Sequence, residues 1–134
     1  MKYAVFFIAL LFVGRPITSM AQNLTFEHAG RTIEVAKEDL PSKMDYPEAM
    51  EACKELGNGW RLPNLEELKA MYEQLYKKGK GNFDNFWYWS STPNGEWPTS
   101  CGWYLNFTSG LDGNSINSGY KSTIYRVRAV RTLP

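Results

Sequence analysis

Two amphipathic helix patterns follow one another between residues 45 and 79, and each starts at its own capping residue. Asp45 and Asn64 are typical N-cap residues, and a glutamate follows each of them three positions later. Apolar residues then recur at helical spacing, and glycines end both patterns. The predicted apolar faces are Tyr46, Ala49, Met50, Cys53 and Leu56 in the first helix, and Leu65, Leu68, Met71, Tyr72, Leu75 and Tyr76 in the second.

Short β-like segments lie on both sides of this helical pair. Residues 24–35 alternate apolar and polar side chains around Ala29-Gly30, which predicts a hairpin. Further strands are predicted at residues 86–91, 102–108 and 124–133, whereas the Gly-, Asn- and Ser-rich residues 109–122 suit tight turns or a short strand. A hairpin, two helices and a run of short strands describe an α+β domain with a small, mostly antiparallel sheet.

The first 21 residues have the pattern of a cleavable signal peptide. Lys2 precedes an apolar run from Ala4 to Val13, and Ser19 and Ala21 give a small-x-small cleavage signature. The run is shorter than the roughly 20 apolar residues that a membrane-spanning helix needs. We therefore expect an exported protein, periplasmic, secreted or on the cell surface, with no membrane insertion after cleavage. Residues 22–134 are expected to form one domain.

The charge balance and the two cysteines bear on partners and covalent structure. A net charge of +1 gives no field that would steer nucleic acid to the protein. In an oxidising compartment Cys53 and Cys101 form a disulfide, or else Cys53 is a buried free thiol on a helix face. The sequence leaves both alternatives open.

Four short motifs carry a resemblance to one bacterial family. They are Gly59-Trp60-Arg61-Leu62-Pro63-Asn64 with Glu66-Glu67-Leu68, then Tyr88-Trp89-Ser90-Ser91-Thr92, then Trp103-Tyr104-Leu105-Asn106-Phe107 with Gly110, and last Val127-Arg128-Ala129-Val130-Arg131. In this order and spacing the chain resembles the Lcl C-terminal domain family from about Met44 to Thr132. That family is a domain of unknown function and is similar to the formylglycine-generating-enzyme branch of the C-type-lectin-like fold. The resemblance therefore implies a C-type-lectin-like domain.

The same resemblance implies binding rather than catalysis. The name-giving member is an adhesin-like surface protein that binds sulfated glycans, but its collagen-like region has no counterpart in a chain without a Gly-x-y repeat. Formylglycine-generating enzymes use two closely spaced cysteines, whereas Cys53 and Cys101 lie far apart. Arg128 and Arg131 match the family's terminal motif, which implies that they form ion pairs of the scaffold.

Loops and strands supply the candidate ligand contacts. Sugar rings pack their C–H faces on aromatic side chains, while Asn, Asp and Lys bond the hydroxyl groups. Trp97 lies in a polar loop, where it either contacts a ligand or packs back over the domain. Arg61 either binds an anion or, in the structural interpretation that we favour, pairs with Glu66 or Glu67 or satisfies carbonyls in the turn. The candidate ligand-binding residues are Trp97, Tyr104, Asn106, Asp112, Asn114, Tyr120, Lys121 and Arg126.

The sequence predicts no metal site, no cofactor and no catalytic pair. Asp112 stands in a lone acidic turn, short of the carboxylates that a calcium site needs, and His28 has no fixed partner. We therefore predict a monomeric, non-enzymatic module that binds a glycan or another cell-surface polymer. The alternative is a structural or assembly protein of the cell envelope that docks a protein partner. A degenerate relative of the formylglycine-generating oxidases is the third reading.

Overall fold

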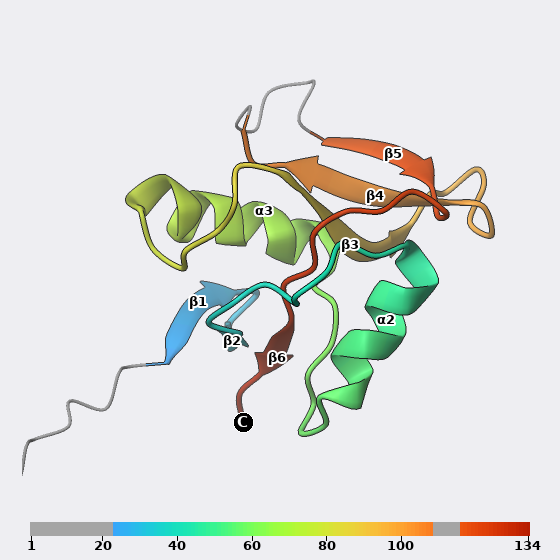
Figure 1. Cartoon of the computed structure of the whole chain (residues 1–134). Helices are drawn as coiled ribbons and strands as arrows, with labels where there is room; N and C mark the ends of the chain where they lie inside the picture. Colours follow the sequence, from blue (N-terminus) through green and yellow to red (C-terminus); the bar gives the residue numbers. More distant parts are fainter. Residues whose placement is uncertain (1–22, 109–115) are drawn as a thin grey trace, which may run out of the picture.

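The computed structural model describes residues 23–108 and 116–134 (Figure 1). The predicted signal peptide and the candidate residues Asp112 and Asn114 lie outside the described residues. In chain order the elements are β1 (Leu24–His28), β2 (Arg31–Val35), α2 (Tyr46–Glu55), α3 (Leu65–Gln74), the 3-10 helix η1 (Tyr76–Lys78), β3 (Trp87–Pro93), β4 (Cys101–Asn106), β5 (Ile116–Tyr120) and β6 (Val130–Thr132). The predicted α+β class is confirmed, while the finer assignment to the C-type-lectin-like fold stays a prediction.

Both helices begin where the capping residues predict. Asn64 and Glu67 form a complete capping box, because each side chain accepts from the other residue's backbone N–H. At the start of α2, the Asp45 side chain accepts from the Glu48 N–H at 3.0 Å. The predicted apolar face of α2 is too wide, since Tyr46, Ala49 and Cys53 are buried while Met50 and Leu56 are exposed. Only the central stripe of this helix meets the sheet.

Two three-stranded antiparallel sheets replace the single small sheet that we predicted. The first has the strand order β1-β2-β6 and the second β3-β4-β5. The predicted hairpin is confirmed, and its two-residue turn has positive φ at both Ala29 (51°) and Gly30 (75°). Figure 1 shows the first sheet near the C-terminus and the second sheet on the far side of α3.

The predicted last strand is longer than the observed one. Only Val130–Thr132 joins a ladder, although the preceding residues run extended between the two sheets. There Val127 and Ala129 accept from the N–H groups of Leu40 and Ala36, both at 2.9 Å, and Arg126 bonds to β3 on the other side. Because residues 36–44 form an irregular connection around Pro41, they give this segment separate bonds and one isolated bridge, between Met44 and Tyr125, but no continuous ladder.

Each helix contributes to its own core cluster. Leu68 and Met71 of α3 pack with buried residues of both sheets, among them Ile33 of β2 and Leu105 of β4. The stripe of α2 packs in a second cluster with Trp89, Tyr104, Tyr125 and other buried residues. The two faces of the second sheet are therefore covered by different helices, α3 on one and α2 on the other.

Candidate functional site

A shallow hollow opens where β4 starts and β5 ends. Its lining residues are Trp97, Ser100, Cys101, Ser118, Gly119 and Tyr120, and its volume is about 370 Å³. Trp97 is 59% exposed and Tyr120 is 71% exposed, the largest values for bulky apolar residues in the described part of the chain. We call this feature the aromatic hollow. It brings two predicted ligand residues together from separate segments of the sequence.

Strand register explains how the aromatic hollow forms. Cys101 lies opposite Tyr120, and Trp103 lies opposite Ser118. Directly opposed residues of antiparallel strands point to the same face, so these four side chains share one face of the second sheet. Leu105 continues this face and packs with Leu68 and Met71 of α3. Helix α3 thus covers one part of the face and leaves open the part around Cys101.

The loop that carries Trp97 is held from inside by Asn94. Asn94 is buried, and its Oδ1 accepts from the backbone N–H groups of Glu96 (2.7 Å) and Trp97 (3.0 Å). Its Nδ2 donates to Ser118 Oγ at 2.9 Å, which ties the loop to β5. The backbone of Trp97 is therefore fixed although its indole ring stands in solvent.

Lys121 closes the same loop from the other side. Its ammonium group donates to the Pro98 carbonyl at 2.6 Å and lies 4.5 Å from the centre of the Tyr46 ring. Its backbone N–H donates to the Ser100 carbonyl at 2.8 Å. Lys121, which we predicted as a ligand contact, thus holds the loop in place and does not line the aromatic hollow.

Tyr104, a predicted ligand contact, does not line the aromatic hollow but packs against Gly119 of its lining. It is only 7% exposed and stacks on Trp87 with ring centres 5.1 Å apart. A Cβ on Gly119 would come within 3.0 Å of the Tyr104 ring, so the glycine allows β5 to lie close over it. The alternation in β4 turns Tyr104 inward and its neighbours Cys101 and Trp103 outward.

Two further predicted residues lie elsewhere. Asn106 Oδ1 accepts from the backbone N–H (2.9 Å) and the hydroxyl (2.6 Å) of Thr108, and it shapes the turn after β4. Arg126 lines a different hollow together with Glu38, Asp39 and Asp84, and its Nη2 lies 2.9 Å from Asp84 Oδ2. Arg126 is thus already paired and belongs to an acidic part of the surface.

The predicted disulfide does not form in this structure, where both cysteines are free thiols. Cys53 is fully buried on the α2 stripe, while Cys101 is half-buried at the aromatic hollow. Burial raises the pKa of Cys53 to about 12, so its thiol stays protonated at neutral pH. The alternative of a buried free cysteine on a helix face is the one that the structure supports.

The arginines of the family-like motifs are structural. Arg128 has a fully buried side chain and lies 2.7 Å from Asp39, while Arg131 lies 2.7 Å from Glu34. Arg61 makes a two-bond contact with Glu67, at 2.7 and 2.8 Å, as our favoured reading expected. Burial opposes ionisation of Glu67, but hydrogen bonds from Arg61 and the Asn64 backbone prevail and lower its pKa.

Other chemistry has little support in the described residues. No three of their Asp, Glu, His or Cys side chains gather where they could share a metal ion. His28 borders a hollow that is also lined by Arg31, Arg61 and Glu67. None of the helices within the described ranges is long and apolar enough to cross a membrane.

Sequence reasoning missed the polar part of the lining. Ser100, Ser118 and the supporting residue Asn94 are not among the candidate residues that the sequence predicts. The usable signal is Asn94-Gly95-Glu96-Trp97, since an Asn side chain that caps the N–H groups two and three residues later is a common turn device.

Comparison with known proteins places the chain in a family. No curated protein gives a significant match over this sequence. The sequence pattern of the Lcl C-terminal domain matches residues 20–131, which covers the whole described fold up to β6. The motifs noted above all fall within this match. The chain therefore belongs to the Lcl C-terminal domain family, a family of unknown function.

Proposed function

We propose that this protein is an exported, non-enzymatic module that binds a glycan or another cell-surface polymer in the aromatic hollow. The observation that carries the proposal is the exposure of Trp97 and Tyr120, which both line one depression. Large apolar side chains usually stay out of water unless they serve an interface or a ligand site. The signal-peptide pattern at residues 1–21 supports export.

The lining suits a sugar ring. The flat rings of Trp97 and Tyr120 offer surfaces for the C–H faces of a pyranose, and the Ser100 and Ser118 side chains supply hydroxyl partners. Because Asn94 and Lys121 already fix the Trp97 loop, binding loses little conformational entropy there.

The charge of the lining favours an uncharged sugar unit. None of the six lining residues carries a formal charge, and Glu96 lies exposed beside Trp97 in the sequence. The ammonium of Lys121 is bonded to the Pro98 carbonyl and is directed over the Tyr46 ring. A sulfate or carboxylate on the ligand would therefore find no cation in the aromatic hollow and would lose its hydration.

The state of the cysteines supports a binding role over thiol chemistry. A catalytic thiol needs thiolate character, and burial of Cys53 acts against it. Cys101 lines the aromatic hollow without a histidine or lysine among the other lining residues to activate it.

A glycan array tests the proposal. The purified protein is applied to neutral glycans and to their sulfated counterparts, and the retained glycans are then titrated with Trp97→Ala, Tyr120→Ala and Leu56→Ala. Leu56 is a matched control because it is an exposed apolar residue on α2, outside the lining. We expect both aromatic variants to bind at least about tenfold more weakly, which corresponds to about 1.4 kcal/mol, and the control to bind as the parent does.

Two results would overturn the proposal: retention of no glycan, or unchanged affinity in both aromatic variants. If the protein bound no glycan on the array and captured one envelope protein, the alternative role in envelope assembly would be favoured. A requirement for sulfate would leave glycan binding standing and would contradict the argument from the uncharged lining.

A further inference from the structure

The outer edge of the first sheet has backbone peptide groups that do not pair with another strand. Strand β1 is an edge strand, paired with β2 on one side only. In a hairpin with a two-residue turn, the residues that flank the turn form a hydrogen-bonded pair, and pairs then alternate along the ladder. His28 pairs with Arg31, so Phe26 and Leu24 bond to β2 as well. The peptide groups of Thr25 and Glu27 consequently point outward, away from the sheet.

The side chain of Gln74 in α3 forms hydrogen bonds with the outward N–H and carbonyl of Glu27. The Glu27 N–H donates to Gln74 Oε1 at 3.2 Å, and Gln74 Nε2 donates to the Glu27 carbonyl at 2.8 Å. A primary amide offers one donor and one acceptor in the same arrangement as a peptide group. Gln74 therefore takes the place of an added strand at Glu27 and ends the open edge there.

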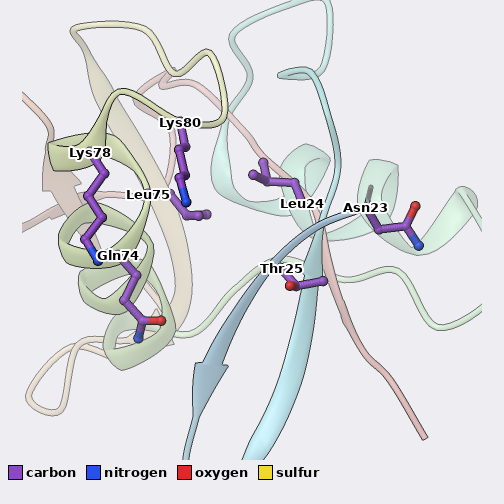
Figure 2. Close-up of a pocket in the computed structure, with 7 residues that line it drawn as sticks. All are labelled: Asn23, Leu24, Thr25, Gln74, Leu75, Lys78 and Lys80. Carbon is purple, nitrogen blue, oxygen red and sulfur yellow. The ribbon is translucent and has the colours of Figure 1, made fainter. Parts of the chain in front are cut away.

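The outward peptide groups of Thr25, two residues earlier, open into a hollow of about 420 Å³. Figure 2 shows its lining, to which the edge strand contributes Leu24 and Thr25 and the end of α3 contributes Gln74 and Leu75. The two leucines pack on the α3 core and give the hollow an apolar floor. We call this feature the edge notch.

Two lysines give the edge notch a positive charge. Lys78 and Lys80 both line it and are exposed, and neither has an ion-pair partner among the described residues. Lys77, which lies between Gln74 and Lys78 in the sequence, is instead paired with Glu73 at 2.9 Å. None of the lining residues is acidic, so the charge of the two lysines is not compensated within the edge notch.

We infer that the edge notch binds a short acidic peptide segment in extended conformation. The backbone of the peptide adds to β1 at Thr25, an apolar side chain lies over Leu24 and Leu75, and carboxylate side chains face Lys78 and Lys80. Gln74 limits the added strand to a few residues and sets its register. The outward peptide groups favour a peptide over a simple anion, because a peptide can both accept from the Thr25 N–H and donate to the Thr25 carbonyl, whereas an anion can only accept. This site is separate from the aromatic hollow and does not depend on the proposed function.

The test is an NMR titration of the isotopically labelled protein with a blocked pentapeptide that alternates Glu and Val. The control probe is the same peptide with Lys in place of Glu. We expect amide shifts that are confined to β1 and to residues 74–80 with the acidic peptide and are absent with the basic one. The double variant Lys78→Glu, Lys80→Glu should weaken binding at least about tenfold, whereas Lys77→Glu should not.

A second arm separates strand addition from simple charge attraction. Thr25→Pro removes the outward N–H while leaving the β2 ladder intact, since that N–H takes no part in it. Loss of binding in this variant, or slower hydrogen exchange of the Thr25 amide in the peptide-bound parent, supports strand addition. Equal binding of both peptides, no binding of either, or parent-like binding with unprotected Thr25 would each overturn the inference.

Discussion

The surroundings of the two sheets are stabilised by different kinds of contact. Around the first sheet, half-buried arginines pair with carboxylates, as Arg61 does with Glu67 and Arg131 with Glu34, and Arg128 pairs with Asp39 in the segment between the sheets. Around the second sheet, aromatic rings pack on one another, and Trp89 by itself lies within 6 Å of the ring centres of Tyr46, Tyr104 and Tyr125. These three arginines are thus occupied by the scaffold. The second sheet has more aromatic surface than its core uses, and the excess is exposed at Trp97 and Tyr120.

Among variants that lose an ion pair, the replacement of Arg128 should reduce the free energy of unfolding most. Its guanidinium donates to Asp39 and to the carbonyls of Ala36, Gly81 and Asn82, at 2.7–3.1 Å. Arg128→Met keeps the volume but leaves Asp39 Oδ1 and three carbonyls without this donor, while Asp39 Oδ2 keeps only the hydrogen bond from the Tyr88 hydroxyl. We expect the free energy of unfolding in urea to fall by about 3–5 kcal/mol.

The matched control is Arg126→Met, two residues earlier in the same segment. Its side chain is 28% exposed, and its partner Asp84 is 45% exposed. Its Nε is buried without a hydrogen-bond partner among the described residues, so removal of this atom breaks no hydrogen bond there. We expect a loss below about 1 kcal/mol, and equal losses in the two variants would contradict the structural role of Arg128.

The replacement of Glu67 should lower the free energy of unfolding by less, and by an amount that depends on pH. Its folded-state pKa is lowered, so its ionised form stabilises the protein above the ordinary Glu pKa of about 4.3. That stability is lost as the pH falls through the lower folded-state value. Because Arg61 is 40% exposed, we expect Glu67→Gln to reduce the free energy of unfolding at pH 7 by only about 1–2 kcal/mol.

The sign of the pH dependence distinguishes this account from a loss of packing. The difference between parent and Glu67→Gln should shrink as urea unfolding is repeated at progressively lower pH below about 4.3. Glu66→Gln is the neighbouring control, because Glu66 is 65% exposed and pairs with the partly exposed Lys69. A difference that stays constant with pH would contradict the ion-pair contribution.

The same contrast explains what the sequence can and cannot predict. Local signals predict local structure, and the caps at Asp45 and Asn64 and the turn at Ala29-Gly30 are where the patterns place them. The start of the last strand depends on non-local partners. Residues 125–129 alternate apolar and charged side chains like a strand, but their neighbours at 36–44 are an irregular connection, which no local pattern reveals.

The candidate site was predicted in part for the same reason. Trp97 and Tyr120 stand out because bulky rings in polar surroundings are unusual, and the structure brings them together. The burial of Tyr104 beside the predicted hollow could not be predicted, because it depends on which face of β4 is covered by α2. The sequence leaves that choice open until the register is known. The bond of Lys121 to the Pro98 carbonyl could not be predicted either, because this backbone group is more than twenty residues away.

The smallest effect on stability should come from the aromatic hollow itself. The Trp97 indole is largely in solvent, and the loop is held by Asn94 and Lys121 through backbone groups that Trp97→Ala keeps. We expect Trp97→Ala and Tyr120→Ala each to change the free energy of unfolding by less than about 0.5 kcal/mol. Asn94→Ala should by contrast remove several loop bonds and lower stability by about 1–2 kcal/mol. If Trp97→Ala proved as destabilising as Asn94→Ala, the indole would be a packing residue of the loop, and the contrast between an occupied charged scaffold and an unoccupied aromatic surface would fail.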